Sequence, residues 1–356
     1  MKTVFRFALL LLLLLMAAIF VVWQDAETLL QQPLPITQVQ SFEIESGEML
    51  PSALNQLATQ KLIAPERLKI YLRLYARATD KANLIKAGEY ELAPGINSVD
   101  LLNLIISGKT VLHELRLIEG WNFQQIMAAV NANEFLAHTL KDADAAAIMK
   151  AIGKESLPAE GRFFPDTYHF PKRTTDIAFL QRAFAAMENT LNSEWAQRTP
   201  DVPYASPGDA LIMASIIEKE TGVSTERAEV AGVFVRRLRL GMKLQTDPTV
   251  IYGKGVAFDG NLTRADLQTD TPYNSYTRKG LPPTPICMPG RAAIRAALHP
   301  AEGKALFFVA RKDGTHQFSE TLEQHNRAVG EFQLKKPTPV KKHAPVKTHT
   351  KVKRRK

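Results

Sequence analysis

The sequence lacks several features that would assign a function directly. Its 356 residues include one cysteine, Cys287, which excludes an intramolecular disulfide and a cysteine-rich metal site. There is no G-x-S-x-G nucleophile motif, no phosphate-binding P-loop and no dinucleotide fingerprint. His299, His316 and His325 do not have the spacing of metal ligands, so we interpret them as structural and expect no metal or cofactor.

Acidic residues are absent from the C-terminal end of the chain. The formal net charge is +9, but residues 335–356 hold ten Lys and Arg and no Asp or Glu. The rest of the chain therefore holds 35 basic and 36 acidic residues and is close to neutral. We predict that residues 333–356 form a disordered basic tail, that the body has no nucleic-acid partner, and that the tail is weakly attracted to an anionic surface.

Charge is also absent between Phe7 and Gln24. Eighteen residues in a helix span roughly 27 Å, which is close to the hydrocarbon thickness of a bilayer. Lys2 and Arg6 precede this stretch and acidic residues follow it, which places the N-terminus on the cytoplasmic side. We predict that residues 1–24 form an inner-membrane anchor and that the remaining chain is exported.

A cleaved signal peptide is the alternative for this N-terminus, because it also has a basic start and an apolar core. The segment Met16–Ala18 places Met where a small residue is needed for cleavage. Trp23, at the end of the apolar run, fits an interfacial anchor. We therefore favour an uncleaved membrane helix.

The remaining chain is rich enough in apolar residues to bury a core, since 45% of the sequence is hydrophobic and 23% is charged. The patterning predicts an α+β fold. Residues 25–38 are polar and contain two prolines, which indicates a linker. Residues 39–111 predict the order strand, helix, helix, strand and helix, which resembles the LysM-like carbohydrate-binding modules. Residues 112–332 form a larger α+β domain.

A helix predicted over residues 206–222 carries the most informative acidic residue. Ser206 is placed to cap its start, and Gly222 to end it. Between them the helix is almost wholly apolar, and Glu218 shares a face with Leu211 and Ala214. Desolvation there favours the neutral carboxylic acid and raises its pKa, as a general acid requires. The alternative is a structural glutamate paired with an arginine, such as Arg227, Arg236 or Arg237.

Two later segments supply polar groups suited to a sugar-binding groove. The run 245–247 contributes Gln245 and Asp247, and the proline-rich segment 271–290 contributes Tyr273, Asn274 and Tyr276. The spacing of the prolines excludes a regular element in the second segment. Aromatic faces can stack on sugar rings, and amides can bond to hydroxyl and N-acetyl groups. We predict that these residues bind substrate, although an ordinary surface loop is the alternative.

These segments together resemble a known family. The motifs MASIIEKETG, GVFVRRLRLGMKLQTDPTVIYG, YNSYTRKGLPPTPI, AALHP and FFVARKDGTHQFSETLEQHN, preceded by KAGEYEL and EGRFFPDTY, are similar to those of the endolytic murein transglycosylases, the YceG-like or MltG family. The resemblance extends from the membrane anchor to about residue 332. It implies one N-terminal transmembrane helix, a LysM-like module, and a catalytic domain on the periplasmic side of the inner membrane.

The resemblance also implies a reaction. Glu218 would be the acid/base in non-hydrolytic cleavage of the MurNAc–GlcNAc β-1,4 bond within peptidoglycan strands, which makes the protein a lyase. It would protonate the leaving oxygen and then help remove the proton of the C6 hydroxyl, which closes a 1,6-anhydro ring. The implied partners are nascent glycan strands and the peptidoglycan synthases near which the family stops strand elongation. The resemblance assigns nothing to residues 335–356.

Two other classes of function remain open from the sequence. One is a non-catalytic peptidoglycan-binding scaffold that uses the LysM-like module. The other is a two-carboxylate glycoside hydrolase in which Asp247 or Glu220 assists Glu218, which would leave reducing ends in place of anhydro ends.

Overall fold

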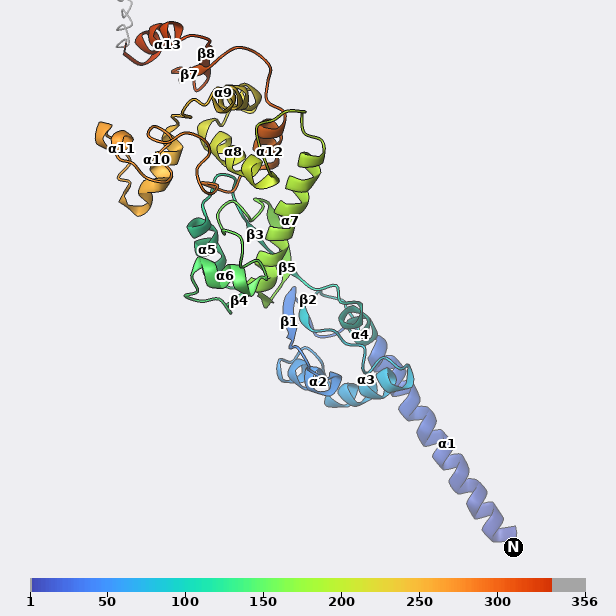
Figure 1. Cartoon of the computed structure of the whole chain (residues 1–356). Helices are drawn as coiled ribbons and strands as arrows, with labels where there is room; N and C mark the ends of the chain where they lie inside the picture. The colour runs from blue at the N-terminus through green and yellow to red at the C-terminus, as the bar shows by residue number, and fades with distance from the viewer. Residues whose placement is uncertain (1, 335–356) are drawn as a thin grey trace, which may run out of the picture. The chain divides into compact units, whose positions relative to one another are not determined.

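The computed structural model describes residues 2–334, and its contacts divide the chain into two compact units (Figure 1). The first unit comprises residues 1–159 and 165–185, and the second comprises residues 160–164 and 186–356. Both contain helices and short two-stranded sheets, which confirms the predicted α+β class. Residues 335–356 of the predicted basic tail lie outside the described residues.

The first unit begins with helix α1 (Lys2–Gln31), the long blue helix of Figure 1. Among the described residues it is the one helix long and apolar enough to cross a membrane, with a mean hydropathy of 2.8 in its apolar window. It is compatible with the predicted single-pass anchor.

Residues 25–38 differ from the predicted linker. The helix continues to Gln31, and Leu29 and Leu30 are buried in the core of the first unit. Leu34 and Ile36, beyond the helix, enter the same core. The segment is polar on average, but its few apolar side chains are spaced so that all four can be buried.

The next part of the first unit follows the predicted order of elements. It consists of β1 (Gln40–Ile44), α2 (Leu50–Thr59), α3 (Glu66–Ala78), β2 (Gly88–Leu92) and α4 (Ser98–Ser107). Strands β1 and β2 pair in antiparallel register. The cap of α4 is Asn97, whose side chain accepts a hydrogen bond from the Asp100 amide at 2.8 Å. The likeness to LysM stays a prediction.

The rest of the first unit contains a second antiparallel pair. Its elements are β3 (Leu112–Arg116), α5 (Phe123–Ala132), β4 (Leu136–Ala137), α6 (Ala145–Ala151), β5 (Thr167–Pro171), β6 (Thr174–Thr175) and the first half of α7 (Asp176–Ala196). Strand β3 pairs with β5, and β4 pairs with β6 in parallel. The domain boundary predicted at residue 112 is not a boundary between the two units, because residues 112–159 belong to the first unit.

The second unit is mainly helical. Its elements are the end of α7, α8 (Pro207–Glu220), α9 (Arg227–Arg239), α10 (Asp247–Lys254), η1 (Gly255–Ala257), α11 (Arg264–Gln268), α12 (Arg291–Leu298), β7 (Phe307–Ala310), β8 (His316–Ser319), α13 (Leu322–Val329) and η2 (Gly330–Leu334). Helix α8 lies in the core, in contact with α9, α10 and α12. The proline-rich segment 271–290 contains no helix or strand, as predicted.

Candidate active site

Helix α8 positions two glutamates at its C-terminal end. The helix starts at a reciprocal capping box, in which the Ser206 hydroxyl accepts from the Asp209 amide and the Asp209 carboxylate accepts from the Ser206 amide. Seven residues between Ala210 and Ile217 are buried, which fixes the helix in the core. Glu218 and Glu220 follow, and because they are two residues apart their side chains leave the helix about 160° apart. The two carboxylates therefore have different surroundings.

Glu218 is held by polar groups of neighbouring elements. Its side chain is 7% exposed, and Oε1 lies 3.3 Å from the Nη2 of Arg227 at the start of α9. Its Oε2 accepts a hydrogen bond of 3.0 Å from the amide of Gly290, the cap of α12. The ion pair is the structural alternative that the sequence left open, with Arg227 as the partner.

Glu220 lines a pocket of 510 Å³ within the second unit. Its Oε2 accepts a hydrogen bond of 2.7 Å from the Thr246 hydroxyl. Burial raises the pKa of the Glu220 carboxyl; the Thr246 bond opposes this rise, the negative charge of Asp247 adds to it, and His316 and Arg237 oppose it to a smaller extent. The raised pKa that the sequence predicted was for Glu218, so it stays a prediction.

The pocket is built from segments that are far apart in the sequence. Strands β7 and β8, helix α13 and the segment before α10 surround the end of α8. Its polar lining consists of Glu220, Arg237, Gln245, Asp247, Tyr276, His316, His325, Asn326 and Gln333. Its apolar lining includes Phe307 and Phe308, so the pocket combines aromatic and hydrogen-bonding surfaces, as sugar-binding sites do. Glu218 is not among the residues that line it.

Three of the five predicted substrate-binding residues lie together in this pocket. Tyr276 donates a hydrogen bond of 2.5 Å from its hydroxyl to Oδ1 of Asp247. Burial and the Asp247 carboxylate raise the pKa of Tyr276, so its hydroxyl stays protonated. Gln245 has a left-handed backbone, with φ of 53°, and its Oε1 accepts from Arg237 at 3.3 Å. The turn at Gln245 directs the chain from the pocket into α10.

The other two predicted residues lie outside the pocket lining. Asn274 is 1% exposed, and its Nδ2 contacts three backbone carbonyl oxygens between Asp266 and Thr269. Its Oδ1 accepts from the Tyr276 amide at 2.8 Å, so Asn274 positions the tyrosine. Tyr273 packs edge-on against Tyr252 and bonds to the Thr284 hydroxyl at 2.8 Å.

Comparison with known proteins identifies the family. A sequence model of the YceG-like family matches residues 42–331. An endolytic murein transglycosylase from Bacillus subtilis (strain 168) is 30% identical over 309 residues, which cover 81% of this chain and 83% of that protein. The chain belongs to the YceG-like family. The resemblance seen in the sequence motifs is therefore confirmed.

Two further comparisons agree. An endolytic murein transglycosylase from Streptococcus pneumoniae serotype 2 (strain D39) is 31% identical over 294 residues, which cover 72% of this chain and 52% of that longer protein. The chain thus spans about half the length of this second relative. A crystal structure of a YceG-like protein from Listeria monocytogenes matches with a TM-score of 0.52 and 30% identity, over 82% of this chain and 99% of that one.

Several pocket residues of this YceG-like chain were not singled out from the sequence. His316 and His325 were interpreted as structural, yet both line the pocket. The Nδ1 of His316 lies 2.8 Å from Glu226, and the His325 ring stacks on Phe307 with centroids 5.3 Å apart. Burial, and to a smaller extent Arg237, lowers the pKa of His325. The only sequence signal was their position in the motif FFVARKDGTHQFSETLEQHN.

The pocket of this YceG-like chain suits acid–base chemistry on a polar substrate. Glu220 supplies a carboxyl group whose pKa is raised by burial, and the Thr246 bond fixes one of its oxygens. Arg237 is held by the Leu306 and Leu244 carbonyl oxygens, each at 2.7 Å, so it braces the pocket wall. Among the described residues, no group of three or more His, Cys, Asp or Glu could hold a metal ion.

Proposed function

We propose that this YceG-like protein is a membrane-anchored endolytic peptidoglycan transglycosylase. It cleaves the MurNAc–GlcNAc β-1,4 bond within nascent glycan strands, leaves 1,6-anhydroMurNAc ends and so terminates strand polymerisation. The two relatives named as endolytic murein transglycosylases support the reaction class, and α1 supports the membrane anchor. The basic residues Lys2 and Arg6 before the apolar segment support a catalytic domain on the periplasmic side. Glycan strands are the substrate, and peptidoglycan synthases are the partners.

We further propose Glu218 as the acid/base, as the sequence indicated, with Glu220 as the alternative. One observation supports Glu218: it lies 7% exposed at the end of the apolar helix α8, where Arg227 and the Gly290 amide hold its two oxygens. Glu220 is the alternative because it lines the pocket with Gln245, Asp247 and Tyr276, and because burial raises its pKa.

The reaction needs a single carboxyl group. Neutral Glu218 gives its proton to the glycosidic oxygen as the bond to C1 breaks. The resulting carboxylate takes the proton of the C6 hydroxyl as that oxygen closes on C1, which restores neutral Glu218. Because the nucleophile belongs to the substrate, no second carboxylate is required to activate water. Asp247, bound by the Tyr276 hydroxyl, orients the pocket wall.

The matched variants Glu220→Gln and Glu218→Gln test the assignment in the full-length protein. The assay digests isolated peptidoglycan and measures anhydro-ended fragments by mass spectrometry. We expect Glu218→Gln to lower the rate by about 10²–10⁴, the usual contribution of a general acid, and to stay folded because it keeps an oxygen to accept from the Gly290 amide. Glu220→Gln keeps an oxygen to accept from the Thr246 hydroxyl and should retain most of the activity, provided that its melting curve shows a folded protein.

Each alternative hypothesis predicts a different result in this assay. A folded Glu220→Gln variant without activity, beside an active Glu218→Gln variant, would assign the acid/base to Glu220. Reducing ends in place of anhydro ends would indicate the two-carboxylate hydrolase, with Asp247 or Glu220, which line one pocket, as the second carboxylate. Binding to peptidoglycan without any fragments from the wild-type protein would indicate the scaffold.

A further inference from the structure

The end of α1 is clamped to α3 by a polar cluster. Asp25, the first acidic residue after the apolar segment, accepts a 2.9 Å hydrogen bond from the Tyr71 hydroxyl. Its Oδ2 also lies 2.9 Å from the Nε of Arg67, and Oδ1 lies 3.2 Å from Nη2 of that side chain. Two contacts from one turn of α3 fix its distance from α1. Helix α3 is therefore held at the point where α1 changes from apolar to polar.

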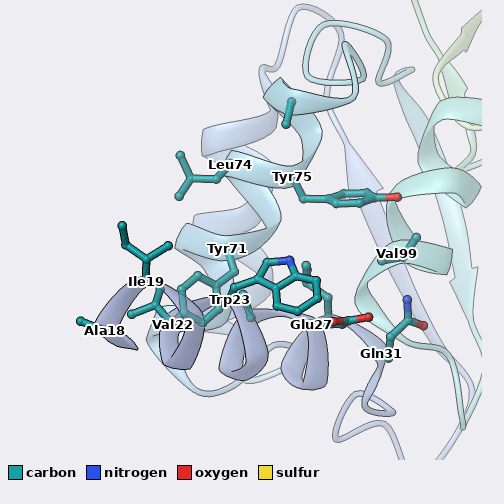
Figure 2. Close-up of a pocket in the computed structure, with 13 residues that line it drawn as sticks. Ala18, Ile19, Val22, Trp23, Glu27, Gln31, Tyr71, Leu74, Tyr75 and Val99 are labelled. Carbon is teal, nitrogen blue, oxygen red and sulfur yellow. The ribbon is translucent and has the colours of Figure 1, made fainter. Parts of the chain in front are cut away.

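Between the two helices lies an apolar groove of 770 Å³ (Figure 2). Helix α1 contributes residues from Ala18 to Gln31, α3 contributes Tyr71, Leu74, Tyr75 and Ala78, and α4 contributes Val99. In Figure 2, Leu74 lies with Ala18 and Ile19 at one end of the groove. Gln31 and Val99 lie at the opposite end. The groove therefore runs from the apolar segment of α1 to its polar continuation.

The rise of helix α1 indicates how deep in a membrane the groove would extend. Ile19 precedes Asp25 by six residues, which places it about 9 Å deeper along α1. Helices that lie in a membrane interface bury their apolar face by about 5–10 Å. When α1 crosses a bilayer, the Ile19 end of the groove is at the depth of the acyl chains.

The outer face of α3 has the composition of an interfacial helix. Ile70 and Leu74 are each 57% exposed and lie one turn apart. Lys69, Arg73 and Arg77 follow on the adjoining side of the helix, so cations flank the apolar pair. Long basic side chains at such positions can reach lipid headgroups while their stems stay in apolar surroundings.

We propose that the groove between α1 and α3 binds an acyl chain of a membrane phospholipid, which seats α3 in the boundary between headgroups and acyl chains. The inference rests on the proposed membrane anchoring of α1. The groove is continuous with the lipid-facing surface of α1, because Ala18, Ile19 and Val22 belong both to the groove and to the apolar segment, where lipid is the surrounding solvent. A peptide there would leave backbone groups without hydrogen-bond partners in hydrocarbon, whereas an acyl chain has none to satisfy.

Single-cysteine labelling of the full-length protein tests the depth of α3. Variants Ile19→Cys, Leu74→Cys and Leu112→Cys receive a fluorophore and are placed singly in phosphatidylcholine–phosphatidylglycerol nanodiscs, some of whose lipid carries a nitroxide on the acyl chain. Native Cys287 is 0% exposed, so it does not compete for the label. Leu112 on β3, also 57% exposed, is the matched control on the same unit.

We expect the nitroxide on the lipid acyl chain to quench the labels at positions 19 and 74. The label at position 112 should keep its fluorescence. Quenching at position 19 with none at position 74 would contradict the placement of α3 among the lipids and leave the membrane anchor supported. No quenching at position 19 would contradict the membrane anchor, and with it the placement of α3. One chain in each nanodisc removes a second copy as a cause of protection or quenching.

Retained lipid provides a second readout. Protein purified in mild detergent is examined by native mass spectrometry for bound phospholipid. We expect the Leu74→Glu variant to lose the bound lipid, because a charge at the acyl-chain end of the groove is costly, and the Leu112→Glu variant to retain it. Equal retention by both variants would contradict an acyl chain in the groove.

Discussion

At the scale of single residues, the two glutamates at the end of α8 show how position on a helix decides chemistry. They share a helix end and a residue type, and their side chains leave the helix about 160° apart. Glu218 contacts an arginine and a backbone amide, whereas Glu220 contacts a threonine hydroxyl and lines a pocket. The two glutamine variants compare these two surroundings.

The raised pKa of Glu220 predicts a pH dependence of stability. Both states hold the proton below the ordinary pKa of 4.5, and above it the unfolded chain ionises while folded Glu220 stays neutral. The free energy of unfolding therefore falls as pH rises from 4.5 to the folded pKa. Glutamine does not titrate, so Glu220→Gln should become increasingly more stable than wild type across this interval. Urea unfolding at several pH values measures it.

The control for this prediction is the exposed Glu302. The Glu302→Gln variant should follow the wild-type pH dependence, because that side chain is solvated in both states. A constant difference between Glu220→Gln and wild type at every pH would show that burial does not displace the Glu220 pKa.

Gly161 gives a second prediction for one residue. Its φ is +78°, and an added Cβ would lie 2.4 Å from Cβ of Pro285. We expect Gly161→Ala to cost about 2–4 kcal/mol, from left-handed strain together with the clash. The matched variant Gly280→Ala has a φ of +82° with nothing within 4 Å, so it should cost only about 1 kcal/mol. Equal losses in chemical unfolding would rule out the contact with Pro285.

At the scale of elements, α8 is the support of the candidate site. Its capping box fixes where the helix starts, and its buried length fixes which residues reach the far end. Glu220 is the last residue of the helix, so it can contact the segment before α10 through Thr246. The sequence predicted this helix, its cap and its end closely, because Ser206, Pro207 and the apolar run are local signals.

The capping box predicts a defined loss of stability. Ser206→Ala removes the hydroxyl that accepts from the Asp209 amide at 3.2 Å, and should lower the free energy of unfolding by about 1 kcal/mol. Ser206→Asp restores an acceptor and should recover most of the loss. Denaturant titration of both variants is the measurement. If both lose stability equally, the hydroxyl does not act as the cap.

At the scale of the whole molecule, charge is divided between a neutral body and a basic tail. The ten basic residues of 335–356 lie outside the described residues, and their charge alone indicates a role. Deleting them should leave transglycosylase activity intact and lower sedimentation with cell wall or anionic liposomes at low salt. Added salt should remove the difference between the two forms. Unchanged sedimentation at low salt would leave the tail without this function.

The sequence alone determined the family, the α+β class, the apolar N-terminal helix and the reaction class. These follow from local patterns, such as a charge-free run, helix caps and motifs with characteristic residue order. Asn274 and Tyr273 also belonged to a matching motif, but a motif does not tell a residue that touches substrate from one that braces its neighbour. The carbonyl contacts of Asn274 show that it braces the backbone between Asp266 and Thr269, and its contact with substrate stays a prediction.

Only the tertiary structure decided what each of the two glutamates contacts. Arg227 and Gly290 contact Glu218, whereas Thr246 contacts Glu220, and strands β7 and β8 line the same pocket as Glu220. Some of those segments lie up to about a hundred residues away in the sequence, so local patterns do not indicate them. The sequence determined that Glu218 lies on an apolar face of this helix, and the fold decided which groups surround it and Glu220, because burial and charge act through space.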